Sequence, residues 1–440
     1  MEHRCRLAAV HTVVLCVLLK MAYPVPVLQA TTSKRSSLAD VHRSTVENTR
    51  PSHDRQNVGN YPEASMTPTE LITSKGYPCE NHYVTTQDGF ILNMQRIPYG
   101  RKSARTHGKD TRPAVLLQHG LLGTSYNWLD NLANESLAYL LADAGADVWL
   151  ANGRGNTFSR NHTTLKPTQP EFWAWSWDEM GAYDLPAMFD HVTRVTGQQQ
   201  IHYVGHSQGT MIGFAGFSTN VTLAAMVKRF YALAPVARVG HIRDPWVRRL
   251  ASMTRRTVLE KMLHRLLGSC GVLTPDWSLG RRLGLTSDHE LYRRVLHVFG
   301  GFRIASANMT RMPVYLAHGP GGTSVRNVFH LAQGINSNKF LKFDFESESE
   351  NSAAYNQTTP PEYLLSNMRV PVLLYRGTDD RLADPADVTW LRAQLPNIVE
   401  DKVIPGFEHL DFIWGMDAPK YCYFDLIAHV FEKSRNDSGL

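Results

Sequence analysis

One serine of the sequence lies in a setting that suits nucleophilic chemistry. Ser207 is the centre of Gly-His-Ser-Gln-Gly at 205–209, between the apolar run 201–204 and the small, helix-compatible residues 210–217. A bare G-x-S-x-G pattern arises by chance in roughly one chain in seven of this length. The flanking strand and helix add weight, because a nucleophile elbow needs a strand, a tight turn with close-packed glycines and a helix. We predict that Ser207 is a nucleophile; the alternative is an ordinary strand-to-helix turn.

A serine hydroxyl needs a base within hydrogen-bond reach and a carboxylate that orients this base. In enzymes with this elbow, the acid and then the histidine follow the serine along the chain. Asp379 and Asp380 follow the strand-like segment 371–375, and His409 follows the strand-like segment 402–404. Both positions lie where α/β active sites collect, at the carboxyl ends of strands. We predict that His409 is the base; local chemistry alone leaves Asp379 and Asp380 as nearly equal candidates for the acid.

Other charged residues near these positions have simpler interpretations. Asp384 and Asp387 suit helix capping or solvation of a loop. Asp411 lies too close along the chain to His409 to be its obvious orienter, and we expect a packing role for His206.

Ester hydrolysis also needs donors for the oxyanion that forms on the acyl carbon. Backbone N–H groups supply such donors in elbow enzymes: one from the residue after the nucleophile and one from a loop after an early strand. Gln208 is the residue after Ser207, and Gln-His-Gly-Leu-Leu-Gly at 118–123 follows the apolar segment 114–117. We predict the N–H groups of Leu121 and Gln208 as the oxyanion hole, against the alternative that 118–123 is a plain glycine-rich turn.

The order of strand-like and helical segments along the rest of the chain predicts an α/β fold of the α/β-hydrolase type. Short apolar or β-branched segments alternate with helical patterns, which indicates a mostly parallel central sheet with helices on both faces. A hairpin is expected around Gln-Asp-Gly at 87–89. The expected strands are 83–86, 91–97, 114–118, 147–150, 201–205, 230–233, 371–375 and 402–404, and the clearest helices are 132–146 and 184–196.

The alternation breaks between 238 and 364, where we expect a helical cap or lid inserted into the core. Apolar residues recur every three to four positions between Trp246 and Leu267, interleaved with arginines, which is typical of amphipathic helices. The predicted core is therefore 61–237 and 365–434. Within the insertion, the acidic and serine-containing segment 346–351 reads as a surface loop.

The N-terminus predicts export. Residues 1–30 read as a signal peptide, with Arg4 and Arg6 before an apolar run too short to span a bilayer, and 31–60 read as a disordered leader or pro-segment. We therefore expect a secreted or lysosomal protein without a transmembrane span. Six N-x-[ST] sequons are candidate glycosylation sites, at Asn134, Asn161, Asn220, Asn308, Asn356 and Asn436.

The number of cysteines and the net charge exclude several classes of protein. Only Cys79, Cys270 and Cys422 follow the predicted signal, and they show no C-x-x-C spacing, so we expect at most one disulfide and no zinc ribbon. A net charge of +6 without a nucleic-acid-binding motif does not predict nucleic-acid binding; an anionic lipid surface suits it better. We expect a monomer that needs neither a metal nor a cofactor.

From 66 to 432 the sequence resembles the acid lipase family that contains gastric lipase and lysosomal acid lipase. The matching motifs are Gly-Tyr-Pro at 76–78, Arg-Ile-Pro-Tyr-Gly at 96–100, Leu-Gln-His-Gly-Leu-Leu at 117–122, Asp-Val-Trp-Leu at 147–150, Arg-Gly-Asn at 154–156, Phe-Trp-Ala at 172–174, Trp-Asp-Glu-Met at 177–180, Tyr-Val-Gly-His-Ser-Gln-Gly-Thr at 203–210 and His-Leu-Asp-Phe-Ile-Trp at 409–414.

The resemblance implies Asp380 as the acid, because it holds the family's spacing to Leu-Ala-Asp-Pro at 382–385. It also implies Leu121 and Gln208 as oxyanion donors, no metal, tolerance of acid and a helical cap. The expected substrates are triacylglycerols or sterol esters at a lipid–water interface. Two rivals stay open: a soluble carboxylesterase or thioesterase, and a secreted binding protein on an inactive hydrolase scaffold. Gastric lipase has a cap disulfide, whereas only Cys270 is available here, so the cap can differ.

Overall fold

The computed structural model describes residues 61–101, 112–253, 271–272 and 301–432. The predicted signal peptide and leader lie outside the described residues. So do Cys270, Asn436 and the second half of the predicted amphipathic stretch.

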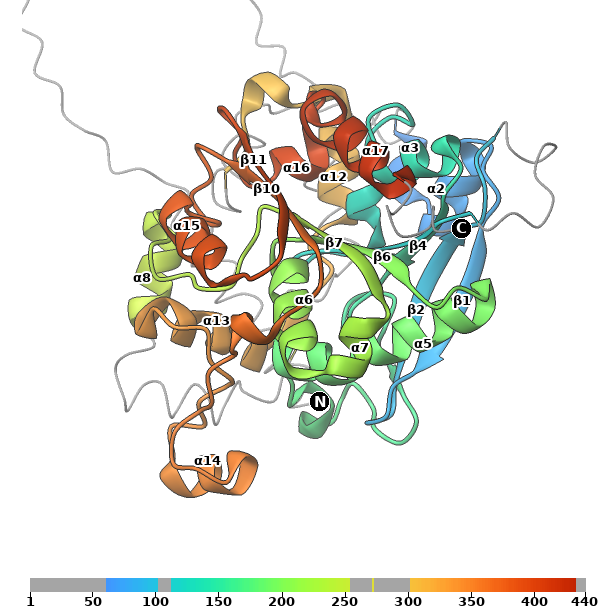
Figure 1. The fold of residues 1–440 in the computed structure, drawn as a ribbon. Coiled ribbons are helices and arrows are strands. Elements are labelled where there is room, and N and C mark those ends of the chain that lie inside the picture. The colour runs from blue at the N-terminus through green and yellow to red at the C-terminus, as the bar shows by residue number, and fades with distance from the viewer. Residues whose placement is uncertain (1–60, 102–111, 254–270, 273–300, 433–440) are drawn as a thin grey trace, which may run out of the picture.

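A nine-stranded sheet forms the centre of the molecule, in the order β1-β2-β4-β3-β6-β7-β10-β11, with β5 paired to β2 (Figure 1). The pairs from β4 through β3, β6, β7 and β10 to β11 are parallel, and those that β2 makes with β1, β4 and β5 are antiparallel. This mostly parallel sheet confirms the predicted fold class. The strands are β1 (Glu80–Thr85), β2 (Phe90–Ile97), β3 (Ala114–Gln118), β4 (Asp147–Ala151), β5 (Asn161–His162), β6 (Ile201–His206), β7 (Val227–Leu233), β10 (Val372–Gly377) and β11 (Ile398–Ile404).

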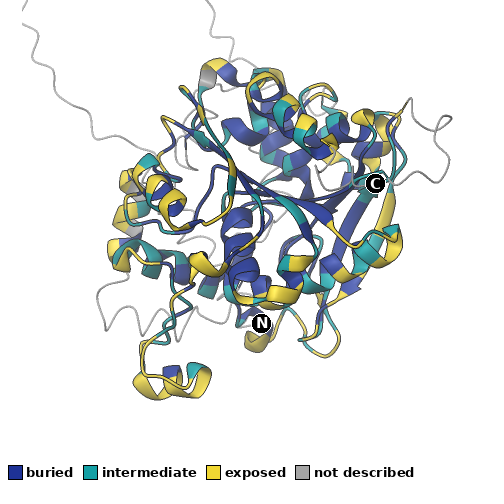
Figure 2. Ribbon diagram, viewed as in Figure 1, coloured by how far each residue is buried: buried dark blue, intermediate teal, exposed yellow. Residues whose placement is uncertain are grey.

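Helices cover both faces of the sheet, with α5, α6 and α7 on one face and α3 and α17 on the other (Figure 1). Figure 2 shows the central strands and α6 as the most buried part of the molecule and the outer helix faces as exposed. The helices of the core are α2 (Pro68–Ser74), α3 (Leu137–Ala144), α4 (Trp177–Glu179), α5 (Leu185–Thr196), α6 (Gln208–Thr219), α7 (Val221–Ala225), α15 (Pro385–Gln394), α16 (Asp411–Trp414) and α17 (Phe424–Phe431). Among the described residues, none of the helices combines the length and the hydropathy that a membrane span requires.

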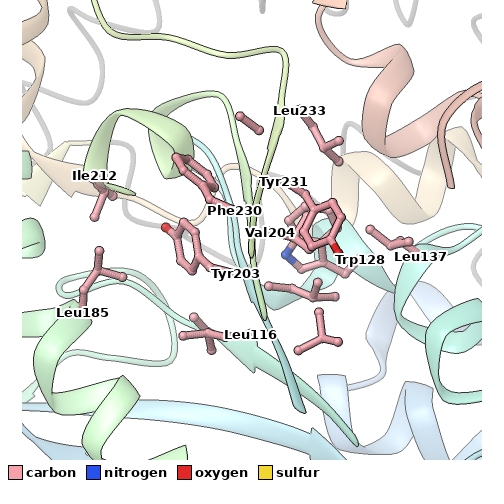
Figure 3. Close-up of a cluster of buried hydrophobic side chains, with 14 of the residues drawn as sticks. Leu116, Trp128, Leu137, Leu185, Tyr203, Val204, Ile212, Phe230, Tyr231 and Leu233 are labelled. Atoms are coloured by element: carbon pink, nitrogen blue, oxygen red, sulfur yellow. The ribbon is translucent and has the colours of Figure 1, made fainter. Parts of the chain in front are cut away.

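Alternating side chains of the central strands explain why both faces need cover. Tyr203 of β6 and its neighbour Phe230 of β7 face Ile212 of α6, whereas Val204 and Tyr231 face the opposite layer (Figure 3). Every one of these side chains is at most 2% exposed. Burial of one such side chain contributes about 1.5–3 kcal/mol, so a strand with two apolar faces is stable only between two helical layers.

The chain between β7 and β10 contributes no strand to the main sheet in its described parts. Its two short strands, β8 (Gly271–Val272) and β9 (Thr323–Ser324), pair only with each other. Its helices are α8 (Pro245–Met253), α12 (Met312–His318), α13 (Val325–Ser337) and α14 (Glu348–Tyr355). The division of the chain into a core and a 238–364 cap stays a prediction.

The prediction of a surface loop at 346–351 is wrong, because helix α14 begins at Glu348. The Ser347 side chain accepts a hydrogen bond from the Glu350 N–H at this helix start, and two glutamates occupy the first turn. Both features stabilise a helix N-terminus. The signal was present as Ser-x-x-Glu at 347–350, a pattern typical of a capping box.

A buried arginine ties the first hairpin to the helical layer. The guanidinium of Arg154 donates to both carboxylate oxygens of Asp88 in the β1–β2 turn and to Asp184 before α5, at 2.6–3.0 Å. The Arg154 side chain is fully buried. We expect Arg154→Ala to lower the free energy of unfolding by about 3–5 kcal/mol, because it leaves two partly or fully buried carboxylates without their partner.

Urea denaturation of Arg154→Ala tests this expectation. Arg101→Ala is the matched control, because it breaks an arginine–aspartate pair whose side chains are 47% and 31% exposed. Such a pair is worth about 0–1 kcal/mol. Equal losses in the two variants would contradict the assignment of Arg154 as a structural link.

Candidate active site

The turn between β6 and α6 holds Ser207 in a strained backbone conformation. Its φ of 53° and ψ of −122° lie in a region that non-glycine residues rarely adopt. The flanking glycines make the turn possible: a Cβ on Gly205 would lie 2.7 Å from the carbonyl of Gly209, and one on Gly209 would lie 2.4 Å from the Gln118 oxygen. The sharp turn leaves Ser207 partly exposed in a strand–helix junction that is otherwise buried.

The structure brings the three residues predicted for nucleophilic chemistry into contact, across 202 positions of sequence. The His409 Nε2 atom lies 2.7 Å from the Ser207 Oγ, and the His409 Nδ1 atom lies 2.9 Å from the Asp380 Oδ2. With the Nδ1 proton donated to the carboxylate, Nε2 has a free lone pair and accepts the serine proton. Of the two acid candidates, Asp380 is completely buried against His409, whereas Asp379 is exposed and accepts a hydrogen bond from Thr378.

The Asp380 carboxylate is held in its charged form. Burial alone raises its pKa, but the charge and hydrogen bond of His409 and the N–H groups of Leu382 and Ala383 outweigh burial. The pKa of Asp380 therefore lies below its ordinary value. Arg243, from the predicted cap, donates to the Asp380 carbonyl at 2.9 Å and helps to fix the loop after β10. This carboxylate can thus orient an imidazole even in acid.

The loop after β3 lies against the nucleophile. A Cβ on Gly120 would lie only 2.9 Å from the Ser207 Cβ, so that only glycine allows this approach. Leu121 is the next residue of this loop. Gln208 is the first residue of α6, where N–H groups have no intrahelical acceptor. The oxyanion hole formed by the N–H groups of Leu121 and Gln208 stays a prediction.

His119 supports this loop, a role that the sequence alone did not reveal. Its Nδ1 atom lies 2.8 Å from the Gly120 carbonyl, and its Nε2 accepts from the Gly153 N–H at 3.0 Å. Burial lowers the pKa of His119 to about 4. A neutral imidazole is required here, because one ring nitrogen donates while the other accepts. Its place directly before the Gly-Leu-Leu-Gly turn was the available signal.

His206 has a more specific contact than the packing role expected for it. Its Nε2 atom lies 3.0 Å from the backbone carbonyl of His409. Burial, followed by the neighbouring His409, lowers the pKa of His206 to about 3, so the ring is a neutral donor. The residue before the serine thereby fixes the backbone of the loop that carries His409.

We expect His206→Phe to lower both stability and kcat. An aromatic ring is kept, but the buried His409 carbonyl loses its donor, which costs about 1–3 kcal/mol, and the His409 loop becomes free to shift. Urea denaturation and ester kinetics measure the two effects. His202→Phe is the control: this histidine lies on the same strand and contacts Tyr231 instead. A kcat loss equal in both variants would contradict a specific role for His206.

The remaining acidic candidates have structural contacts. The Asp384 side chain caps α15 by accepting from the Ala386 N–H, and Asp387 accepts from Arg238 and His241. Asp411 accepts from the Glu408 N–H and from the Ser306 hydroxyl. None of these contacts involves His409.

The candidate glycosylation sites differ in accessibility. Asn134, Asn161 and Asn356 are exposed. Asn220 and Asn308 are half-buried, and their side chains are engaged: Asn220 caps α7, and Asn308 donates to Glu135 at 3.4 Å. Glycosylation stays a prediction, best suited to the three exposed positions. Cys79 and Cys422 are free thiols, half-buried and buried, respectively.

One group of side chains in the described residues has the spacing of a metal site. Glu400, Asp425 and His429 lie close enough for a shared ion. Hydrogen bonds and ion pairs already occupy them: His429 contacts Glu400 at 2.8 Å, and Lys402 contacts Asp425 at 3.0 Å. The group needs no ion to be satisfied, and it has no contact with Ser207 or His409.

Comparisons with known proteins identify the family. The family model described as the partial alpha/beta-hydrolase lipase region matches residues 68–132. The model of the alpha/beta hydrolase fold matches residues 113–266. Gastric triacylglycerol lipase of Rattus norvegicus is 46% identical over 376 residues, which cover 84% of this chain and 93% of the relative. This chain belongs to the gastric lipase family.

Further members of the gastric lipase family give the same result. The Homo sapiens gastric triacylglycerol lipase is 44% identical over 85% of this chain and 93% of its own length. Lipase member K of Homo sapiens is 43% identical over 87% of this chain and 95% of its own length. The resemblance drawn from the motifs is thereby confirmed, and the chain is a lipid ester hydrolase of the α/β-hydrolase fold.

Proposed function

We propose that this chain is an exported serine lipase that hydrolyses fatty acyl esters of neutral lipids, triacylglycerols or sterol esters, through an acyl-enzyme. One observation carries the proposal: the Ser207 Oγ lies 2.7 Å from an imidazole nitrogen whose partner nitrogen lies 2.9 Å from a buried carboxylate. Gastric triacylglycerol lipases among the relatives support the substrate class. The N-terminal signal pattern and the sequons support export.

The proposed reaction has two steps. As the Ser207 oxygen attacks the ester carbonyl carbon, its proton passes to the His409 Nε2, and the carbonyl oxygen becomes an oxyanion that the Leu121 and Gln208 N–H groups bind. His409 then gives that proton to the departing alcohol as the ester C–O bond breaks. Water, deprotonated by His409, attacks the acyl-enzyme and releases the fatty acid with restoration of the Ser207 hydroxyl. Asp380 holds the imidazole tautomer throughout.

The amphipathic surface of the predicted cap suits a lipid–water interface. The structure describes the first part of the amphipathic stretch as α8, where Arg248 and Arg249 are exposed, as expected for contact with an anionic lipid surface. We propose that the protein acts there as a monomer. An interfacial enzyme differs from a soluble esterase in that its turnover rises when the substrate forms an emulsion.

Two measurements test the proposal on the secreted full chain. Hydrolysis of emulsified triolein, cholesteryl oleate and dispersed p-nitrophenyl butyrate at acidic and neutral pH identifies the substrate class; activity confined to the dispersed short ester would refute the lipase assignment. A fluorophosphonate probe, which reacts with activated serines, is expected to label Ser207. Failure to label the folded protein would favour a non-catalytic binding protein.

A further inference from the structure

The side chain of Gln208 is locked to the predicted cap by a pair of amide hydrogen bonds. The Gln208 Nε2 donates to the Asn327 Oδ1, and the Asn327 Nδ2 donates to the Gln208 Oε1, both at 3.0 Å. Gln208 is 6% exposed and Asn327 is fully buried. The two residues lie 119 positions apart, one at the start of α6 and the other in the first turn of α13.

Asn327 is itself rigidly held. Its second Nδ2 hydrogen is donated to the Thr323 hydroxyl at 3.0 Å, and its backbone N–H is donated to the Ser324 hydroxyl at the start of α13. The Ser324 hydroxyl in turn donates to the Trp175 carbonyl. All donors and the acceptor oxygen of the Asn327 amide are therefore used, and the amide can present only one orientation to Gln208.

This contact adjoins the reaction centre, because Gln208 follows the nucleophile and supplies one of the two oxyanion donors. A free Gln208 side chain would have several rotamers at the edge of the site. In some of them its amide could bind the Ser207 oxygen or the substrate carbonyl, in competition with the backbone donors. The pair with Asn327 keeps this amide turned away and fixes the first turn of α6 against α13.

We propose that Asn327 is a positioning residue for the oxyanion hole, and that it couples helix α13 of the predicted cap to the donor at Gln208. The inference rests on the proposed function. It assigns to a cap side chain an effect on the tetrahedral intermediate, without contact between Asn327 and the substrate. A purely structural link between cap and core would instead affect stability alone.

The test compares Asn327→Ala, Gln208→Ala and the double variant on dispersed p-nitrophenyl butyrate, so that interfacial binding does not enter. Gln208→Ala keeps the backbone N–H but removes the same amide pair. Loss of one oxyanion donor costs about 10²–10³-fold in kcat, and misplacement of a donor should cost less, so we expect about a 10-fold fall in kcat for each single variant. KM should stay within about twofold, because the donors act on the transition state.

The double variant shows whether Asn327 acts through Gln208. We expect its kcat to be no lower than that of either single variant, because both changes break the same pair of hydrogen bonds. A loss of kcat equal to the product of the two single losses would overturn the proposal. Affinity for a trifluoromethyl ketone, which forms a tetrahedral adduct with an oxyanion, should fall by the same factor as kcat. A change in KM alone, or unchanged inhibitor affinity, would also overturn it.

Gln333→Ala is the matched control on the same helix. Gln333 makes a comparable pair of hydrogen bonds, to the Asp344 backbone at 2.7 and 3.0 Å, and neither of these bonds involves α6. It should leave kcat unchanged per site titrated with the fluorophosphonate probe. If Asn327→Ala fails to fold, the kcat of Gln208→Ala tests the proposal alone. A kcat equal to that of the wild type would overturn the proposal. Normal turnover of Ser207→Ala would instead refute the proposed function itself.

Discussion

Ser207→Ala is expected to lower kcat on p-nitrophenyl butyrate by about 10⁴-fold or more, as in other hydrolases whose nucleophile is removed. The variant keeps the oxyanion donors and the binding surfaces but has no oxygen to form the acyl-enzyme. Water could attack only if it took the place of the missing hydroxyl, which in the wild-type protein lies 2.7 Å from the His409 Nε2. Measurement of kcat on purified, folded protein decides the prediction.

The fold should tolerate Ser207→Ala, because no side-chain hydrogen bond of Ser207 other than that to His409 is needed to form the turn. Ser218→Ala provides the control on the same helix: that hydroxyl is buried and donates to the Ala215 carbonyl, remote from the nucleophile. We expect it to retain its activity. Wild-type turnover in Ser207→Ala would mean that another group attacks the ester.

The strands that position the site could be predicted from the sequence, because each of them corresponds to a local pattern of apolar residues. β3 and β6 are fully buried strands of mostly apolar residues, and their observed bounds differ from the expected ones by at most one residue. β11 was predicted only from Lys402 onward, whereas it begins at Ile398. It lies at one edge of the sheet, and several of its residues are exposed or partly exposed, so that hydrophobic periodicity carries less information there.

The choice between Asp379 and Asp380 shows what local sequence lacks. Both carboxylates follow β10 on the same loop, and no propensity separates them. The structure separates them by direction: Asp380 turns inward, where the N–H groups of Leu382 and Ala383 hold one oxygen at 2.8–2.9 Å, and Asp379 remains in solvent. Only comparison with a family motif supplied this information beforehand.

Two other contacts between distant segments could not be predicted from local sequence patterns. The bond from His206 to the His409 carbonyl spans 203 positions, and the Gln208–Asn327 pair spans 119. A buried polar residue beside a predicted nucleophile signals that a partner exists. It does not identify the partner, because this depends on which loops the sheet order brings together.

Asp380→Asn is expected to lower kcat by roughly 10⁴-fold while the fold persists. The Asp380 Oδ1 accepts from the Leu382 and Ala383 N–H groups, and an asparagine oxygen can keep both bonds. Its amide nitrogen then replaces the Oδ2 that lies 2.9 Å from the His409 Nδ1. Two donors would face each other at this shorter contact. The Oδ1 atom, 3.1 Å from Nδ1, already accepts from two N–H groups, so we expect Nδ1 to become the acceptor and the proton to move to Nε2. That nitrogen can no longer take the serine proton.

Asp379→Asn is the matched control, because it makes the same chemical change one residue away on an exposed side chain. We expect its kcat to stay within about twofold of wild type, since the Asp379 side chain accepts a hydrogen bond from the Thr378 hydroxyl, away from His409. Comparable losses in both variants would refute Asp380 as the specific orienter. Equal activity of Asp380→Asn and wild type would refute any role of this carboxylate in setting the tautomer.

The pH dependence of stability gives an independent check on the same carboxylate. Folding lowers the pKa of Asp380, despite burial, through His409 and two N–H groups, so in acid the folded protein binds fewer protons here than the unfolded chain. This contribution is complete above the ordinary aspartate pKa of about 3.9 and is lost as pH falls through the lower folded value. The Tm difference between wild type and Asp380→Asn should therefore stay nearly constant from pH 8 to 5 and shrink below about pH 4. A difference that grows as pH falls would mean that the carboxylate is protonated in the folded enzyme, and such a group could not support an imidazolium during catalysis in acid.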